Sequence, residues 1–129
     1  MEKNKSLLYA EDDEFTSSLV LDWFKDFLPQ VNVELVKDGI SLENKLKSGP
    51  NGFKAVLTDN QMPGPNGIHL IKRYAKLPEF ENIPFILYCG ASYSDIKKEG
   101  LESGAFAYLE KSGDYKPLIT LIKNVLKID

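Results

Sequence analysis

Short apolar segments alternate with amphipathic segments along almost the whole chain. Five apolar runs have the length of strands, and several are continuously apolar, which is typical of a sheet covered on both faces. The intervening segments repeat apolar residues at three- and four-residue steps, as helices packed by one face do. The pattern predicts strands at Ser6–Ala10, Val31–Val36, Phe53–Thr58, Pro84–Cys89 and Phe106–Glu110.

The first helix has the clearest pattern, because apolar residues recur at helical spacing from Phe15 to Leu28 and Pro29 follows as a stop. The second is closed by the breaker sequence at 48–50. The fourth begins after a Ser92 cap and ends before Gly104. The second to fifth helices are predicted at Ile40–Lys47, Gly67–Lys76, Tyr93–Ser103 and about Tyr115 to Leu126.

Five strands interleaved with five helices form repeated βα units. They predict one α/β domain over residues 1–129, a doubly wound parallel sheet with helices on both faces. Ligands of such sheets bind outside the carboxyl ends of the strands. The residues able to do chemistry lie at those ends, at Glu11, Asp12, Asp59, Cys89 and Lys111.

The composition narrows the class of protein further. Of 129 residues, 43% are hydrophobic and 27% charged, which favours a folded globular domain over disorder. The net charge of -3 gives no reason to expect direct nucleic-acid binding. The single cysteine excludes an internal disulfide, and no apolar run has the length of a membrane helix or a signal-peptide core. We expect a cytoplasmic domain without membrane contact.

The acids and the lysine at the strand ends indicate a binding site. Carboxylates gathered within a few ångströms repel one another unless a cation intervenes, and Mg²⁺ suits them because it prefers oxygen ligands and phosphate oxygens. Asp59 is the predicted phosphoryl acceptor and a metal ligand, since a carboxylate can attack phosphorus. Asp12 is a predicted direct ligand and Glu11 a ligand through water, while Lys111 neutralises the phosphoryl charge. Any one of these residues alone could be merely solvated, but their joint position favours a site.

The chain resembles the receiver domain of two-component response regulators, with a fold like that of the chemotaxis regulators, over essentially its whole length. Three segments carry the resemblance: an acidic pair after strand one, an acceptor Asp followed by Met-Pro and Gly, and a Gly-Ala, aromatic and Lys run. The matching residues are Glu11 and Asp12; Asp59, Met62, Pro63 and Gly67; and Gly104, Ala105, Tyr108 and Lys111.

The resemblance implies a flavodoxin-like five-stranded sheet in the order 2-1-3-4-5. It implies that the backbone carbonyl of Gln61 is the third protein ligand to Mg²⁺ and that Tyr108 is a switch aromatic. A half-buried strand tyrosine is the alternative for Tyr108. By the same analogy Phe15 faces a phosphodonor helix beside Asp59, or else it belongs to the core. His69 is expected at the surface.

Two positions depart from the family's pattern. Strand four normally ends in Thr or Ser, and here Cys89 takes that place among the catalytic and switch residues; a thiol is a weaker hydrogen-bond donor than a hydroxyl. An ordinary buried cysteine is the alternative, and no nearby base supports a nucleophile. Lys111 is followed by Ser112 instead of Pro, so the peptide bond between them is either trans or a strained cis bond.

The resemblance implies a signalling domain that takes a phosphoryl group onto Asp59 from a sensor histidine kinase or a histidine phosphotransfer protein. It would signal to a downstream output protein or domain through helix four, strand five and helix five, and it is not a conventional turnover enzyme. The chain ends after its last helix, so we expect no output domain within it. It is a stand-alone regulator, a relay carrier or a receiver cut from a longer protein.

Two rival functions stay open at this point. A degenerate receiver that acts as a phosphorylation-independent interaction module is favoured by Cys89 and Ser112, but the intact acids and lysine argue against it. A small Mg²⁺-dependent phosphohydrolase of similar fold would need a further general acid and a capping segment, and the sequence offers neither.

Overall fold

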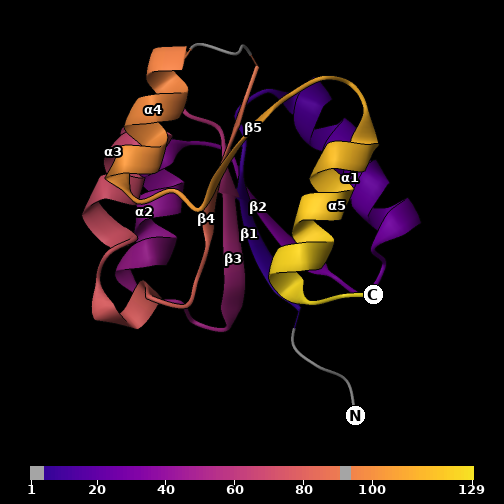
Figure 1. Ribbon diagram of the computed structural model, residues 1–129, viewed down its shortest axis with the longest axis horizontal. Helices are drawn as coiled ribbons and strands as arrows, with labels where there is room; N and C mark the ends of the chain where they lie inside the picture. Colours follow the sequence, from indigo (N-terminus) through magenta and orange to yellow (C-terminus); the bar gives the residue numbers. More distant parts are fainter. Residues whose placement is uncertain (1–4, 91–93) are drawn as a thin grey trace.

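The computed structural model describes residues 5–90 and 94–129, and over these ranges five strands form one parallel sheet (Figure 1). The sheet order is β2-β1-β3-β4-β5, so the predicted doubly wound, flavodoxin-like architecture is confirmed. Each predicted strand is present, three of them starting one residue later than expected. The strands are β1 (Ser6–Ala10), β2 (Asn32–Val36), β3 (Phe53–Thr58), β4 (Phe85–Cys89) and β5 (Ala107–Glu110).

The helices form a layer on each face of this sheet. Figure 1 shows α1 and α5 on one side and α2, α3 and α4 on the other. None of the helices within the described ranges is both long enough and apolar enough to span a membrane. The helices are α1 (Glu14–Phe27), α2 (Gly39–Lys47), α3 (Gly67–Tyr74), α4 (Ser94–Ser103) and α5 (Tyr115–Leu126).

Short polar residues cap the N-termini of four of these helices. In each case a side-chain oxygen accepts a hydrogen bond from a backbone N–H in the first turn, which satisfies a donor that the helix itself leaves unpaired. The capping residues are Asp13, Asp38, Asn66 and Asp114. The predicted cap Ser92 and helix start Tyr93 lie outside the described residues, and α4 is described from Ser94.

The third helix is shorter than its pattern predicts, because it ends at Tyr74 and not at Lys76. Pro78 explains the difference, since a proline disfavours helical geometry in the residue before it. Leu77 is accordingly extended, with φ -71° and ψ 145°, and a short 3₁₀ helix, η1 (Pro78–Phe80), follows. The first helix likewise ends at Phe27, with Leu28 as its C-cap.

Each face of the sheet has its own apolar core. One core packs β-strand residues such as Leu8, Val56 and Leu87 against α2 and α3, and the other packs Leu7 and Leu57 against α1 and α5. Alternate strand residues therefore serve opposite cores, as burial on both faces requires.

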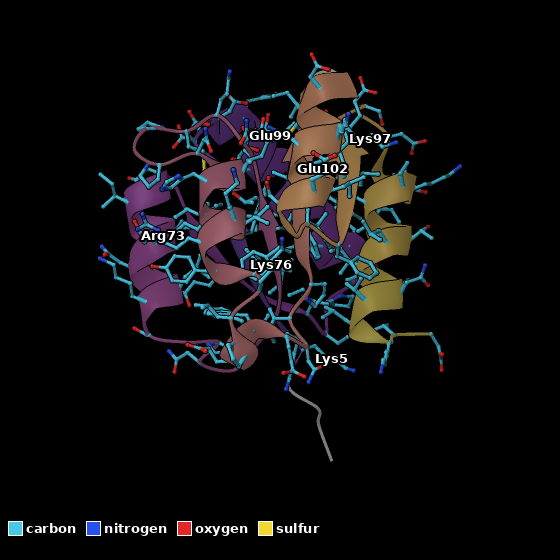
Figure 2. All side chains as sticks on the ribbon, turned by 60° about the vertical axis from the view of Figure 1, so that its left-hand side comes forward. Lys5, Arg73, Lys76, Lys97, Glu99 and Glu102 are labelled. Atoms are coloured by element: carbon cyan, nitrogen blue, oxygen red, sulfur yellow. The ribbon has the colours of Figure 1, made fainter. Side chains whose placement is uncertain are left out.

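Helices α3 and α4 are also tied together at the surface. Figure 2 shows Lys76, just after α3, on the same side of the molecule as Glu102 of α4. The Lys76 Nζ donates a hydrogen bond to the carbonyl oxygen of Glu102 across 3.4 Å. Because the strands are parallel, their carboxyl ends lie along one edge of the sheet. At this edge Ala10 pairs with Thr58 and Cys89 pairs with Glu110.

Candidate phosphoryl-acceptor site

Lys111 lies between two carboxylates at the carboxyl edge of the sheet. Its Nζ is 2.8 Å from Glu11 Oε1 and 3.1 Å from Asp59 Oδ2. The Glu11 side chain is fully buried, while those of Lys111 and Asp59 are 17% and 14% exposed. The fold thus brings together three of the predicted site residues, from the ends of three different strands.

Backbone hydrogen bonds hold Asp59 at the end of β3. Its N–H donates to the carbonyl oxygen of Ala10 across 3.1 Å, and its Oδ1 accepts from the backbone N–H of Asn60 at 2.7 Å. The carboxylate of Asp59, the predicted phosphoryl acceptor, is therefore oriented by the backbone.

Asn60 is a positioning residue that the sequence interpretation missed. Its side chain is buried, and its Oδ1 accepts from the N–H of Ile68 across 2.9 Å. Its carbonyl oxygen accepts from the N–H of Gly67, so one asparagine connects the acceptor to the start of α3. An Asn two residues after the end of an apolar strand was the available signal, since this side chain bonds readily to nearby backbone.

Gly67 allows α3 to begin directly against the acceptor loop. A Cβ at this position would lie 2.4 Å from the carbonyl oxygen of Asp59 and 3.2 Å from the Asn60 Cα. Both neighbours are backbone atoms that cannot turn aside, so the loop closes this tightly only around glycine.

Three carboxylates are close enough to share one metal ion. One oxygen from each of Glu11, Asp12 and Asp59 lies within 4.8 Å of the other two. Asp12 is exposed and Glu11 buried, so the cluster has an open side that faces solvent. Hard oxygen donors with room for waters fit Mg²⁺. Gln61 lines the same cleft, and the role of its carbonyl as a ligand stays a prediction.

At both Glu11 and Lys111, burial and the neighbouring opposite charges shift the pKa in opposite directions. Burial raises the pKa of the Glu11 carboxyl, and contact with Lys111 opposes that rise. Burial alone would lower the pKa of Lys111, but Glu11 and Asp59 beside it raise that pKa overall. The ammonium charge is therefore held in place by the two acids.

Cys89 is buried and also lines the cleft beside Asp59, which has a volume of about 400 Å³. Burial, and after it the charge of Asp59, raise the pKa of the thiol to about 11. The group is thus a protonated thiol at neutral pH, which fits a weak donor or an inert core cysteine and not a nucleophile.

The loop after β5 keeps Lys111 in place without the family's proline. The peptide bond between Lys111 and Ser112 is trans, so the strained cis alternative is wrong. Lys111 still reaches both carboxylates, because its backbone N–H is fixed to the carbonyl oxygen of Cys89 at 2.7 Å.

Three other predicted positions are placed by the structure. Tyr108 is half-buried and packs against the core that includes α2 and α3. Phe15 is 78% exposed, so the alternative that it belongs to the core is wrong. It is the second residue of α1, and the buried residues of that helix begin at Ser17. His69 is exposed, as predicted.

A family model described as the response regulator receiver domain matches residues 7–123. The chain belongs to this family. It is a receiver domain of two-component signalling, and the resemblance first drawn from three short segments is confirmed.

Individual relatives agree with this assignment. A probable transcriptional regulator of Porphyra purpurea, ycf29, is 27% identical over 127 residues, 96% of this chain and 57% of its own length. Chemotaxis protein CheY-3 of Vibrio cholerae is 27% identical over 111 residues, covering 86% of this chain and 83% of its own. The chain thus spans only part of the first of these relatives.

Solved structures show the same fold. A putative response regulator from Chloroflexus aurantiacus superposes with a TM-score of 0.85 at 24% identity, covering 97% of this chain and 99% of the other. At that identity the likeness shows the fold alone.

Proposed function

We propose that this receiver domain accepts a phosphoryl group on Asp59, with Mg²⁺ at the acidic cluster, and passes the signal on by a conformational change. The observation that carries the proposal is the position of Lys111 between Glu11 and Asp59, beside the three-carboxylate cluster. An acceptor, a metal site and a fixed positive charge are what phosphoryl transfer to a carboxylate requires.

In the proposed step one Asp59 carboxylate oxygen attacks phosphorus. The phosphorus–nitrogen bond of the donor phosphohistidine breaks, and the leaving imidazole nitrogen keeps the electron pair and takes up a proton. Mg²⁺ held by Glu11, Asp12, Asp59 and the Gln61 carbonyl would supply charge neutralisation and fix the phosphoryl oxygens. The Asn60 N–H orients the Asp59 carboxylate, and Lys111, 3.1 Å from Asp59 Oδ2, would pair with the phosphoryl oxygens.

Signalling would follow as a shift between two arrangements of the domain. A contact made only to the phosphoryl group would bias that shift, and we assign it to Cys89 because this residue lines the cleft beside Asp59. Tyr108, on the neighbouring strand, is the proposed moving aromatic; in the β4–β5 register it lies opposite Leu87.

The chemistry is autocatalytic, so we do not assign a conventional turnover activity. The proposed donors are a sensor histidine kinase or a histidine phosphotransfer protein, and the proposed target is a separate output protein or domain. One relative is named as a probable transcriptional regulator and another as a chemotaxis protein, so we do not propose a particular output for this chain.

A phosphorylation-independent interaction module is not favoured. Such a module has no need for Lys111 to contact two acids or for three carboxylates within 4.8 Å. A phosphohydrolase is also disfavoured, because the described cleft residues beyond the acidic cluster are Asn60, Gln61, Cys89, Gly90, Ile96 and Lys111, with no further carboxylate.

Intact mass after incubation with acetyl phosphate and Mg²⁺ tests the proposal. The wild type should gain one phosphoryl group that hydroxylamine removes, and Asp59→Ala should gain none. Asp26→Ala, which removes an exposed acid from the far part of α1, is the matched control and should be phosphorylated like the wild type. An unmodified wild type, or full modification of Asp59→Ala, would overturn the proposal.

A further inference from the structure

Two tyrosines of the sheet lie in the apolar core that packs against α1 and α5. They are Tyr9 of β1 and Tyr88 of β4, with 0% and 3% of their surface exposed. Within the described residues the Tyr9 hydroxyl has no hydrogen-bond partner. The Tyr88 ring, in contrast, has a charged neighbour, because the Nζ of Lys111 lies over it, 5.8 Å from the ring centroid. A buried aromatic ring next to the lysine of the site calls for an account beyond packing.

The register of β4 and β5 explains how Lys111 reaches this ring. Tyr88 pairs with Leu109, and both belong to the core on the α1 and α5 side. Lys111 follows Leu109 by two residues, so strand alternation directs its side chain to the same face of the sheet. Cys89, the next residue after Tyr88, belongs to the core on the other face. Neighbouring residues of β4 therefore contact the site from two sides of the sheet.

Three groups surround the Lys111 ammonium. Glu11 Oε1 lies 2.8 Å from Nζ, Asp59 Oδ2 lies 3.1 Å from it, and the Tyr88 ring completes the set. The distance to the ring centroid is within the roughly 6 Å at which a cation is attracted to the negative face of an aromatic ring. Because both side chains are largely shielded from water, solvent weakens this attraction little.

The Tyr88 ring remains uncharged beside these ions. Burial raises the pKa of its phenol, and the charge of Lys111 opposes that rise. The phenol is therefore protonated at neutral pH and does not compete with Asp59 as a further anion. The ring attracts the ammonium without adding negative charge where a phosphoryl group would have to bind.

A lysine benefits from such support because its four-carbon stem is flexible and its three N–H donors rotate freely. Attraction to the face of a ring does not depend on the direction of any one N–H bond. The Lys111 ammonium can therefore turn an N–H towards a phosphoryl oxygen on Asp59 and still lie over the Tyr88 ring.

We propose that Tyr88 is a positioning residue for phosphoryl transfer, whose ring holds the Lys111 ammonium beside Asp59 by cation–π attraction. The inference rests on the proposed function, in which Lys111 pairs with the phosphoryl oxygens. It gives the residue before Cys89 a role in the site, although it lies in the core and does not line the cleft.

The test compares Tyr88→Phe and Tyr88→Leu with the wild type in the full chain. The first readout is the NMR shift of the Lys111 Cε methylene protons, assigned by their loss in Lys111→Met. Protons over the face of an aromatic ring are shifted upfield, so these protons should be upfield in the wild type and in Tyr88→Phe. In Tyr88→Leu they should return to the ordinary position of a lysine.

The second readout is the affinity for beryllofluoride in the presence of Mg²⁺, with beryllofluoride as the phosphoryl mimic. Tyr88→Leu should bind it about fivefold more weakly than the wild type, because the attraction that holds the ammonium is lost. Tyr88→Phe keeps the ring and should bind like the wild type. A merely structural role would lower the stability of Tyr88→Leu and leave its affinity unchanged.

Phe24→Leu is the matched control, since it removes another buried aromatic ring from the same core. It should lower the stability to urea but leave both the Lys111 shift and the beryllofluoride affinity as in the wild type. The methylene shift is read on the wild type, so it tests the ring contact even if Tyr88→Leu does not fold.

The outcomes separate the two proposals. Lys111 methylene protons at their ordinary position in the wild type, or equal affinities of Tyr88→Leu and the wild type, would overturn the role of Tyr88 alone. An equal loss of affinity in Phe24→Leu would overturn it as well. A wild type that binds no beryllofluoride would overturn the proposed function together with this inference.

Discussion

The backbone N–H of Lys111 donates to the carbonyl oxygen of Cys89 across 2.7 Å, and this bond joins the ends of β4 and β5. The thiol and the ammonium group therefore stand on neighbouring strand ends whose spacing the sheet fixes. One contributes the cleft wall and the other the charge beside Asp59. If Asp59 is phosphorylated as proposed, a substitution of either side chain should change the groups around the phosphoryl oxygens and leave this backbone bond between the strand ends in place.

We expect Mg²⁺ to bind weakly at the acidic cluster, because few protein ligands are offered and waters complete the shell. Replacing Asp12 and Asp59 together by Asn should abolish binding, as measured by NMR shifts of the strand-end amides. Glu43→Gln is the control, since that carboxylate accepts from Arg73 and Tyr74 away from the cluster. Undiminished affinity in the double variant would contradict the predicted site.

Cys89→Thr should move the phosphorylated domain further towards its active arrangement than the wild type goes. A hydroxyl is a better hydrogen-bond donor than a thiol, and a hydrogen bond to a charged acceptor contributes roughly 1.5–3 kcal/mol. Gaining even half of that free energy would change the ratio of active to inactive domains several-fold. The measurement is the NMR response of Tyr108 and its strand to beryllofluoride and Mg²⁺. If the wild type already shifts completely to the active arrangement, the thiol does not limit switching and the prediction is wrong.

Lys111→Met should destabilise the metal-free domain by about 2–3 kcal/mol at pH 8, because it leaves the buried Glu11 carboxylate without its cation. The loss should shrink as the pH falls. Burial raises the pKa of Glu11 above its unfolded value of 4.5, and without Lys111 only the hydrogen bond from the Asp13 backbone N–H opposes that rise. The folded state then binds the extra proton, so its stability decreases as the pH rises above 4.5.

Urea unfolding of Lys111→Met between pH 5 and pH 8 measures this trend, and Lys111→Met combined with Glu11→Gln is the matched control. The double variant should show a flatter dependence on pH. An equally steep dependence would assign the effect to another group.

Gly67→Ala should destabilise the domain by about 1–3 kcal/mol, because its Cβ meets the backbone of Asp59 and Asn60. Gly90→Ala is the matched control for stability, since a Cβ there has no atom within 4 Å. Urea unfolding of both variants tests the claim. Equal urea midpoints for the two variants would show that the backbone of Asp59 and Asn60 can move to accommodate the added Cβ, and would contradict the prediction.

The sequence by itself determined the architecture and assigned the acids and the lysine of the site to one edge of the sheet. The continuous apolar runs predict a sheet buried on both faces, and the strands lie within one residue of their predicted bounds. Parallel strands share a carboxyl edge, so the places of Glu11, Asp59 and Lys111 followed from topology. These features depend on local pattern and on general rules of chain connection.

Only the tertiary structure decided which partners these residues have. The position of Phe15 on α1 permits either a core or a surface role, and packing leaves its side chain exposed. The burial of Glu11 against Lys111, the orienting bond from Asn60 to Asp59 and the unpaired hydroxyl of Tyr9 are equally absent from any local pattern. Periodicity tells which face of an element is apolar, whereas burial and hydrogen-bond pairing depend on side chains that only the folded chain brings together.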